Sequence, residues 1–154
     1  MKSINLTLMV TLLIVSACKQ QAPLTDADRV AVTAQVKNLL DATSDSVRAH
    51  GFNGWVPFLD NSSQFTWQAT DKRPSDYGEM IKDITTLNPK YRSISITWDS
   101  VVVKPVSLNE AEISAKYSET LVDTLGQSGP INGIFEAKVI NTEKLWKYRS
   151  VHTH

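Results

Sequence analysis

The stretch LWKYRSVHTH, residues 145–154, decides how the rest of the sequence is interpreted. Because successive side chains of a β-strand point to opposite sides, one face of a strand here would carry four residues. These are Trp146, Tyr148, Ser150 and His152. Two large aromatic side chains on one face need a packing partner. We therefore predict that this strand closes a sheet whose inner face packs against helices from earlier in the chain.

Composition and charge narrow the class of protein. The chain has 154 residues, a length that favours one domain, and 42% of them are hydrophobic, which is enough for a core. Sixteen basic and sixteen acidic residues cancel, so the sequence lacks the basic excess of nucleic-acid-binding domains. We expect no nucleic acid among its partners.

The first eighteen residues have the pattern of a bacterial lipoprotein signal. Lys2 precedes an apolar run over residues 6–15 that is too short to span a bilayer comfortably. The run ends in Val15-Ser16-Ala17-Cys18, which resembles a lipobox, in which a signal peptidase cuts before the cysteine and its sulfur carries a diacylglycerol. A core helix or a simple secretory signal would leave the position of Cys18, the only cysteine, unexplained.

This interpretation divides the chain into three parts. Residues 1–17 form the signal peptide, residues 18–24 form a lipidated tether, and residues 25–154 form the folded domain. The lipid on Cys18 would anchor the protein to a membrane of the cell envelope. Lys19 in place of an aspartate favours the outer membrane, facing the periplasm.

The domain begins with helical periodicity and ends with strand periodicity. Apolar residues predict an amphipathic helix over Asp26–Ala49 with Thr25 as its N-cap, and Ser75 is the predicted cap of a second helix. Interrupted alternation at Asp99-Ser100 predicts a bulge in the first long strand. The remaining predicted elements are a helical turn at 54–60, strand 63–69, helix 76–87, and strands 91–104, 111–122, 131–140 and 145–154. This order predicts an α+β fold, a curved antiparallel sheet packed on one face by helices.

The same order of elements resembles the nuclear transport factor 2-like, or SnoaL-like, superfamily, a cone-shaped fold of cystatin-like type. Trp146 with His152 six positions later is similar to the family's frequent tryptophan-led ending. Residues 133–135 and 111–117 are similar to the two strands before it, and the resemblance covers residues 25–154. It implies a conical pocket, which in this family hosts isomerases, dehydratases, cyclases and domains without catalysis.

The resemblance makes the face with Trp146, Tyr148, Ser150 and His152 the expected lining of the pocket. His152 is then a candidate base, with the Tyr148 hydroxyl meeting the same substrate from the other end. The alternative is that the aromatic residues are core packing and His152 is a satisfied, partly buried histidine. The sequence offers no Asp or Glu on a clearly buried face.

The two histidines near the end of the sequence, His152 and His154, would also share a face. Two ligands without a third make a weak metal site, so we assign no metal. The sequence also has no Cys-x-x-Cys motif and no phosphate-binding glycine loop, and we assign no cofactor. The sequence therefore predicts a lipid-anchored envelope protein that binds a small apolar ligand or a protein partner, with a second copy of itself as the first candidate. The alternative is a small isomerase or hydratase-like enzyme that uses His152.

Overall fold

The computed structural model of the protein describes residues 23–143 and 145–154. The predicted signal peptide, residues 1–17, and the predicted lipidation site Cys18 lie outside the described residues. None of the helices within the described ranges has both the length and the apolar character needed to cross a membrane.

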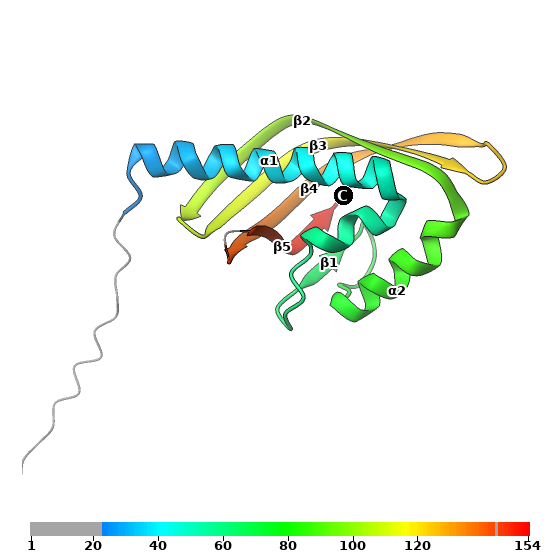
Figure 1. Cartoon of the computed structure of the whole chain (residues 1–154), viewed down its shortest axis with the longest axis horizontal. Coiled ribbons are helices and arrows are strands. Elements are labelled where there is room, and N and C mark those ends of the chain that lie inside the picture. The colour runs from blue at the N-terminus through cyan, green and yellow to red at the C-terminus, as the bar shows by residue number, and fades with distance from the viewer. Residues whose placement is uncertain (1–22, 144) are drawn as a thin grey trace, which may run out of the picture.

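In the described part of the chain, two α-helices and two short 3₁₀ helices accompany one five-stranded sheet (Figure 1). In chain order the elements are α1 (Asp26–His50), η1 (Gly51–Phe58), β1 (Thr66–Gln68), α2 (Tyr77–Leu87), η2 (Asn88–Lys90), β2 (Tyr91–Ser107), β3 (Glu110–Asp123), β4 (Ser128–Thr142) and β5 (Leu145–Thr153). The strand order is β1-β5-β4-β3-β2. The α+β prediction is confirmed, but the sheet is mixed, because the short edge strand β1 pairs parallel to β5.

Helix α1 forms as its sequence predicts. The Thr25 hydroxyl accepts from the Asp28 amide at 3.2 Å, and the Asp28 carboxylate accepts from the Thr25 amide at 3.0 Å, so both donors of the first turn are satisfied. The helix ends at Gly51, whose φ of 64° suits a residue without a side chain. The apolar stripe is buried along its whole length, at Val32, Val36, Leu39, Leu40, Thr43 and Val47. This stripe gives the sheet the helical partner that it needs.

The bulge predicted at Asp99-Ser100 is present in β2. The pairing of β2 with β3 shifts register between Asp99 and Val102, and Ser100 has a φ of 53°. A bulge bends the strand that contains it. Figure 1 shows β2 curving along its length as it passes α1, so the sheet is bent and not flat.

The start of α2 differs from the prediction. Asp76, not Ser75, caps the helix, and its carboxylate accepts from the Glu79 amide at 2.9 Å. Ser75 instead pairs its backbone with Trp67, through hydrogen bonds of 2.8 and 2.9 Å. Both residues have short polar side chains that suit an N-cap, so local sequence does not separate them.

The closing strand contains a second bulge that the sequence did not predict. Tyr148 pairs with Val139 and Ser150 pairs with Lys138, which leaves Arg149 as an extra residue in β5. An extra residue reverses the alternation beyond it. Trp146 and Tyr148 therefore face the core, whereas the core residue beyond the bulge is Val151. The prediction that Ser150 and His152 share the face of Trp146 is wrong, since both lie on the outer face of the sheet.

Candidate functional site

A cavity of about 290 Å³ lies on the inner face of the sheet, between the strands and the segment that contains η1 and α2. Its lining comes from nearly every element of the fold. The residues are Phe52, Trp55, Trp67, Ala69, Lys72, Arg73, Ser75, Met80, Asp83, Ile84, Leu87, Ile96, Trp98, Tyr117, Glu119, Ile131, Phe135 and Thr153. A mostly apolar lining with a few polar groups is the usual make-up of a small-molecule site.

Aromatic side chains form much of the cavity wall. The rings of Trp55 and Trp67 meet edge to face with centroids 5.0 Å apart, and those of Trp98 and Phe135 do so at 4.9 Å. Edge-to-face contacts are a favoured arrangement of aromatic rings and stabilise the wall that they form. The indole nitrogen of Trp98 donates to the Ser44 hydroxyl at 2.7 Å. Because this polar atom is already satisfied within the protein, Trp98 presents an apolar surface to the cavity.

Glu119 is the carboxylic acid on the strand wall of this cavity. It lies in β3 and pairs across the sheet with Ile96 on β2 and Ile131 on β4, so two isoleucines flank it. Both isoleucines also line the cavity. Burial raises the pKa of Glu119 from 4.5 to about 7. Near neutral pH this group therefore exchanges readily between the acid and the carboxylate, which suits it to bind or transfer a proton.

Tyr117 places a hydroxyl two residues before Glu119 on the same strand. Burial raises the pKa of Tyr117, and the negative charge of Glu119 raises it further. The phenol therefore stays protonated and keeps a proton to donate. Side chains two apart on a strand share a face, so a bound molecule can meet both groups.

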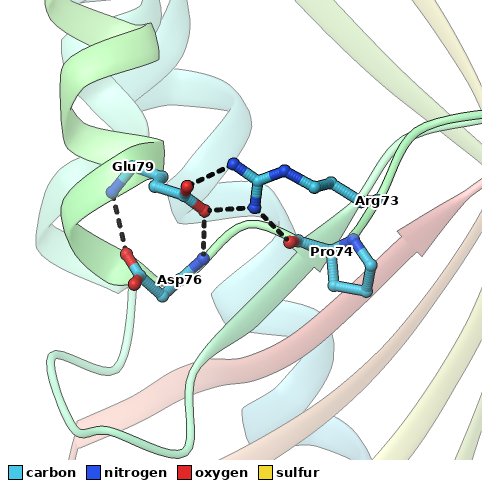
Figure 2. Close-up of polar contacts among 4 residues, drawn as sticks. All are labelled: Arg73, Pro74, Asp76 and Glu79. Carbon is cyan, nitrogen blue, oxygen red and sulfur yellow. Dashed lines mark hydrogen bonds and ion pairs between the residues drawn. The ribbon is translucent and has the colours of Figure 1, made fainter.

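Charged residues gather at the rim of the cavity, on the loop between β1 and α2. Arg73 donates to the Glu79 carboxylate through both terminal nitrogens, one of them at 3.0 Å, and also to the Pro74 carbonyl (Figure 2). Glu79 in turn accepts from the Asp76 amide at 3.3 Å. The exposed pair adds little stability, but it ties the rim loop to the first turn of α2. The contacts of Arg73 therefore link the loop at the cavity edge to the start of α2.

The predicted site residues do not meet in this cavity. Trp146 packs beneath α1, and its indole nitrogen donates to the Gln35 side chain at 2.8 Å. Tyr148 is fully buried, its hydroxyl lies 3.2 Å from the Thr43 hydroxyl, and burial raises its pKa well above the usual range. Ser150 and His152 line a separate groove on the outer face of the sheet. No single substrate can therefore meet Tyr148 and His152 on one face, as the sequence interpretation required.

Glu119 is the residue that the sequence interpretation missed. Alternate residues of β3 face inward, from Ala111 through Tyr117 to Leu121, and Glu119 occupies one position of that same series. The sequence itself shows this signal, because Glu119 is a single charged residue within an otherwise apolar series of alternate positions. Buried charges are rare without a partner, so such an interruption favours a functional role.

Comparison with known proteins by sequence gives no relative. No family model matches the chain, and no curated protein sequence matches it significantly. Comparison by structure gives many similar folds. The protein is similar to a scytalone dehydratase-like protein from Novosphingobium aromaticivorans, with a TM-score of 0.71 and 12% identity over 84% of this chain and 87% of that chain.

Two further structures are similar over most of their length. One is a nuclear transport factor 2-like superfamily protein from Salmonella enterica, with a TM-score of 0.70 and 13% identity over 82% of this chain and 92% of that one. The other is a hexachlorocyclohexane dehydrochlorinase from Novosphingobium barchaimii, with a TM-score of 0.67 and 13% identity over 84% and 90%. The chain therefore has the nuclear transport factor 2-like fold, and at this identity the likeness establishes the fold alone.

Proposed function

We propose that the protein is a lipid-anchored envelope protein whose conical cavity binds a small, largely apolar molecule. One observation carries the proposal: an aromatic cavity of about 290 Å³ contains a single carboxyl group on its strand wall. The volumes of ligand pockets in proteins start at about 300 Å³. This cavity is at the small end of that range, so its ligand is compact. A ligand with one hydroxyl, amine or amide group would give Glu119 a hydrogen-bond partner.

The test of the cavity uses the full chain and two matched variants. Ala69→Phe adds bulk within the cavity lining, whereas Val102→Phe adds the same ring to the outer face, where Val102 is 62% exposed. We expect wild type and Val102→Phe to bind the apolar fluorophore N-phenyl-1-naphthylamine equally and Ala69→Phe to bind it at least tenfold more weakly. Equal binding by all three would overturn the proposal. Mass spectrometry of molecules extracted from the native protein then identifies the ligand.

The anchor is proposed from the sequence alone, since Cys18 lies outside the described residues. The lipobox ending in the only cysteine supports it. Wild type should incorporate radioactive palmitate and fractionate with the outer membrane, and Cys18→Ser should do neither and remain an unprocessed precursor. A wild-type protein that is unlabelled and soluble in the periplasm would contradict the anchor. Pairing with a second copy stays a prediction, which sedimentation of the detergent-solubilised protein would test.

A second candidate function is acid–base catalysis, and Glu119 favours it. A carboxyl with a pKa of about 7 can remove a proton from carbon and return it, and Tyr117 can donate a hydrogen bond to the oxygen that gains charge. Two proteins of similar fold are named as a dehydratase-like protein and a dehydrochlorinase, and eliminations of that kind remove a proton. The histidine version of this hypothesis loses its support, because no histidine of the described residues lines the cavity.

Uptake of deuterium by the bound molecule distinguishes catalysis from binding. The molecule that co-purifies is incubated with protein in deuterium oxide, and its mass is followed with time. Catalysis predicts exchange at a carbon position by wild type, at least a hundredfold less by Glu119→Gln, and normal exchange by Glu112→Gln on the outer face. No exchange above the rate without protein would leave binding as the function.

A further inference from the structure

We propose that Glu136, His152 and His154 form a binding site for a divalent transition-metal ion, with Zn²⁺ as its probe, on the outer face of the sheet. The site is separate from the cavity and does not depend on the function proposed for it. The bulge at Arg149 creates it, because beyond that residue the alternation of β5 turns the two histidines outward.

Strand register brings the third ligand to the histidine pair. Glu136 on β4 lies directly opposite His152 on β5, and His154 follows His152 two positions later on the same face. Opposite residues of adjacent antiparallel strands have their Cβ atoms about 5 Å apart. The sequence interpretation rejected a metal because it found two ligands, and the missing one comes from a neighbouring strand.

The side chains already lie close to a coordination geometry. One potential ligand atom from each residue lies within 4.8 Å of the other two, and the two imidazole centroids are 4.8 Å apart. Tetrahedral zinc with bonds of about 2.0–2.1 Å places its ligand atoms about 3.3 Å apart. All three side chains are exposed. Small rotations about their side-chain bonds would therefore bring the ligand atoms from the present separation of up to 4.8 Å to the zinc-bound separation without moving the core.

The backbone beneath the ligands is held in place. The His154 amide donates to the Ile134 carbonyl at 3.1 Å, and the Ile134 amide donates back to the His154 carbonyl at 2.6 Å. On the other side of β5, the Thr70 hydroxyl donates to the Thr153 carbonyl at 3.0 Å. The two histidines therefore stand on paired backbone, and little conformational entropy of the main chain is lost when a metal binds.

The donor set selects the class of metal. Two imidazoles and one carboxylate suit Zn²⁺ and its first-row neighbours better than Ca²⁺ or Mg²⁺, which prefer oxygen ligands. The nearby cation Lys138 lies 3.5 Å from Glu110, which leaves the Glu136 carboxylate to the histidines. Three protein ligands leave one position of a tetrahedral ion open to water. Two of the three, Glu136 and His152, line a groove of about 540 Å³.

Calorimetric titration of ZnCl₂ into the full chain, purified without a polyhistidine tag and stripped of metal, tests the site. We expect one Zn²⁺ per chain, and His152→Ala, His154→Ala and Glu136→Gln each to weaken the affinity at least tenfold. His50→Ala removes the remaining histidine of the sequence, at the end of α1, and should bind as wild type does.

Co²⁺ gives an independent measurement, because its visible absorption intensifies when it is bound with low coordination number. Wild type and His50→Ala should give this spectrum, and the three ligand variants should lose it while their circular dichroism remains native. The proposal is overturned if wild type binds no Zn²⁺, or if His50→Ala weakens binding as much as His152→Ala does.

Discussion

Replacing Glu119 by glutamine should make the protein more stable at high pH, by an amount that the structure predicts. The pKa of Glu119 is about 7 in the folded protein, against 4.5 as the reference for the unfolded chain. Each pKa unit corresponds to about 1.4 kcal/mol, which gives about 3.4 kcal/mol as an upper value. Glu119 is only partly buried, so we expect about 2–3 kcal/mol.

The sign follows from the protons bound in each state. Well below pH 4.5 the carboxyl is protonated in both states, and it does not change the stability. Between pH 4.5 and 7 the unfolded chain releases the proton while the folded protein retains it, so stability falls as pH rises. Well above pH 7 the carboxyl is ionised in both states, and the loss of stability is complete. Glutamine has nearly the same shape but cannot ionise, so Glu119→Gln should not lose this stability as pH rises.

Urea unfolding followed by circular dichroism, from pH 4.5 to 8, measures the difference between variant and wild type. The stability of Glu119→Gln relative to wild type should rise from near zero at pH 4.5 to about 2–3 kcal/mol at pH 8. Glu112→Gln is the control, because a hydrogen bond from Lys104 lowers the pKa of Glu112 and its charged form is favoured in the folded protein. Its contribution is lost only as pH falls below 4.5, so the stability of Glu112→Gln relative to wild type should hardly change between pH 4.5 and 8. If the difference in stability between Glu119→Gln and wild type is the same at every pH in this range, burial does not raise the pKa of Glu119 and the reasoning is refuted.

Three further substitutions test the packing around β5. Trp146→Ala should lower the free energy of unfolding by about 3–5 kcal/mol in urea melts, since it removes a buried aromatic side chain, and a loss below about 1 kcal/mol would contradict its burial. Tyr148→Phe should cost about 1 kcal/mol, the value of its hydrogen bond with Thr43, and Tyr148→Ala several times more. Asp60→Asn should destabilise at pH 7 but not at low pH. Burial opposes the charge of Asp60, but hydrogen bonds from Ser62 and Arg149 hold its pKa below 3.8. The charged carboxylate therefore stabilises the fold at pH 7, and this stabilisation is lost as pH falls below 3.8. If Asp60→Asn lowers the free energy of unfolding equally at pH 7 and pH 2.5, the explanation is refuted.

Features that depend on neighbouring residues could be predicted from the sequence. The apolar stripe of α1 and its Thr25 cap follow from helical spacing and from the chemistry of one turn. The bulge in β2 follows from an interruption at Asp99 and Ser100 that is visible in the strand itself. In each case the residues that cause the structure lie within a few positions of it.

The bulge in β5 coincides with a contact to a distant segment of the chain, and the sequence of the strand did not reveal it. Asp60, from the segment after η1, donates its amide to the Tyr148 carbonyl at 2.8 Å and accepts from the Arg149 side chain at 3.0 Å. The two residues of this ion pair are 89 positions apart in the sequence. Perfect alternation remained the simplest interpretation of the strand, and it placed His152 in the wrong environment. A contact between residues so far apart in the sequence leaves no local pattern from which the bulge could be predicted.

The bulge also places the cavity and the proposed metal site on opposite faces of the same two strands. Phe135 and Thr153 are paired across β4 and β5, and both line the cavity. The neighbouring residues Glu136, His152 and His154 point the other way as the proposed ligands. A metal that draws these three side chains together would restrain the backbone that carries the cavity wall. If the two sites are coupled through this backbone, the factor by which Zn²⁺ changes the affinity for the cavity ligand equals the factor by which that ligand changes the affinity for Zn²⁺.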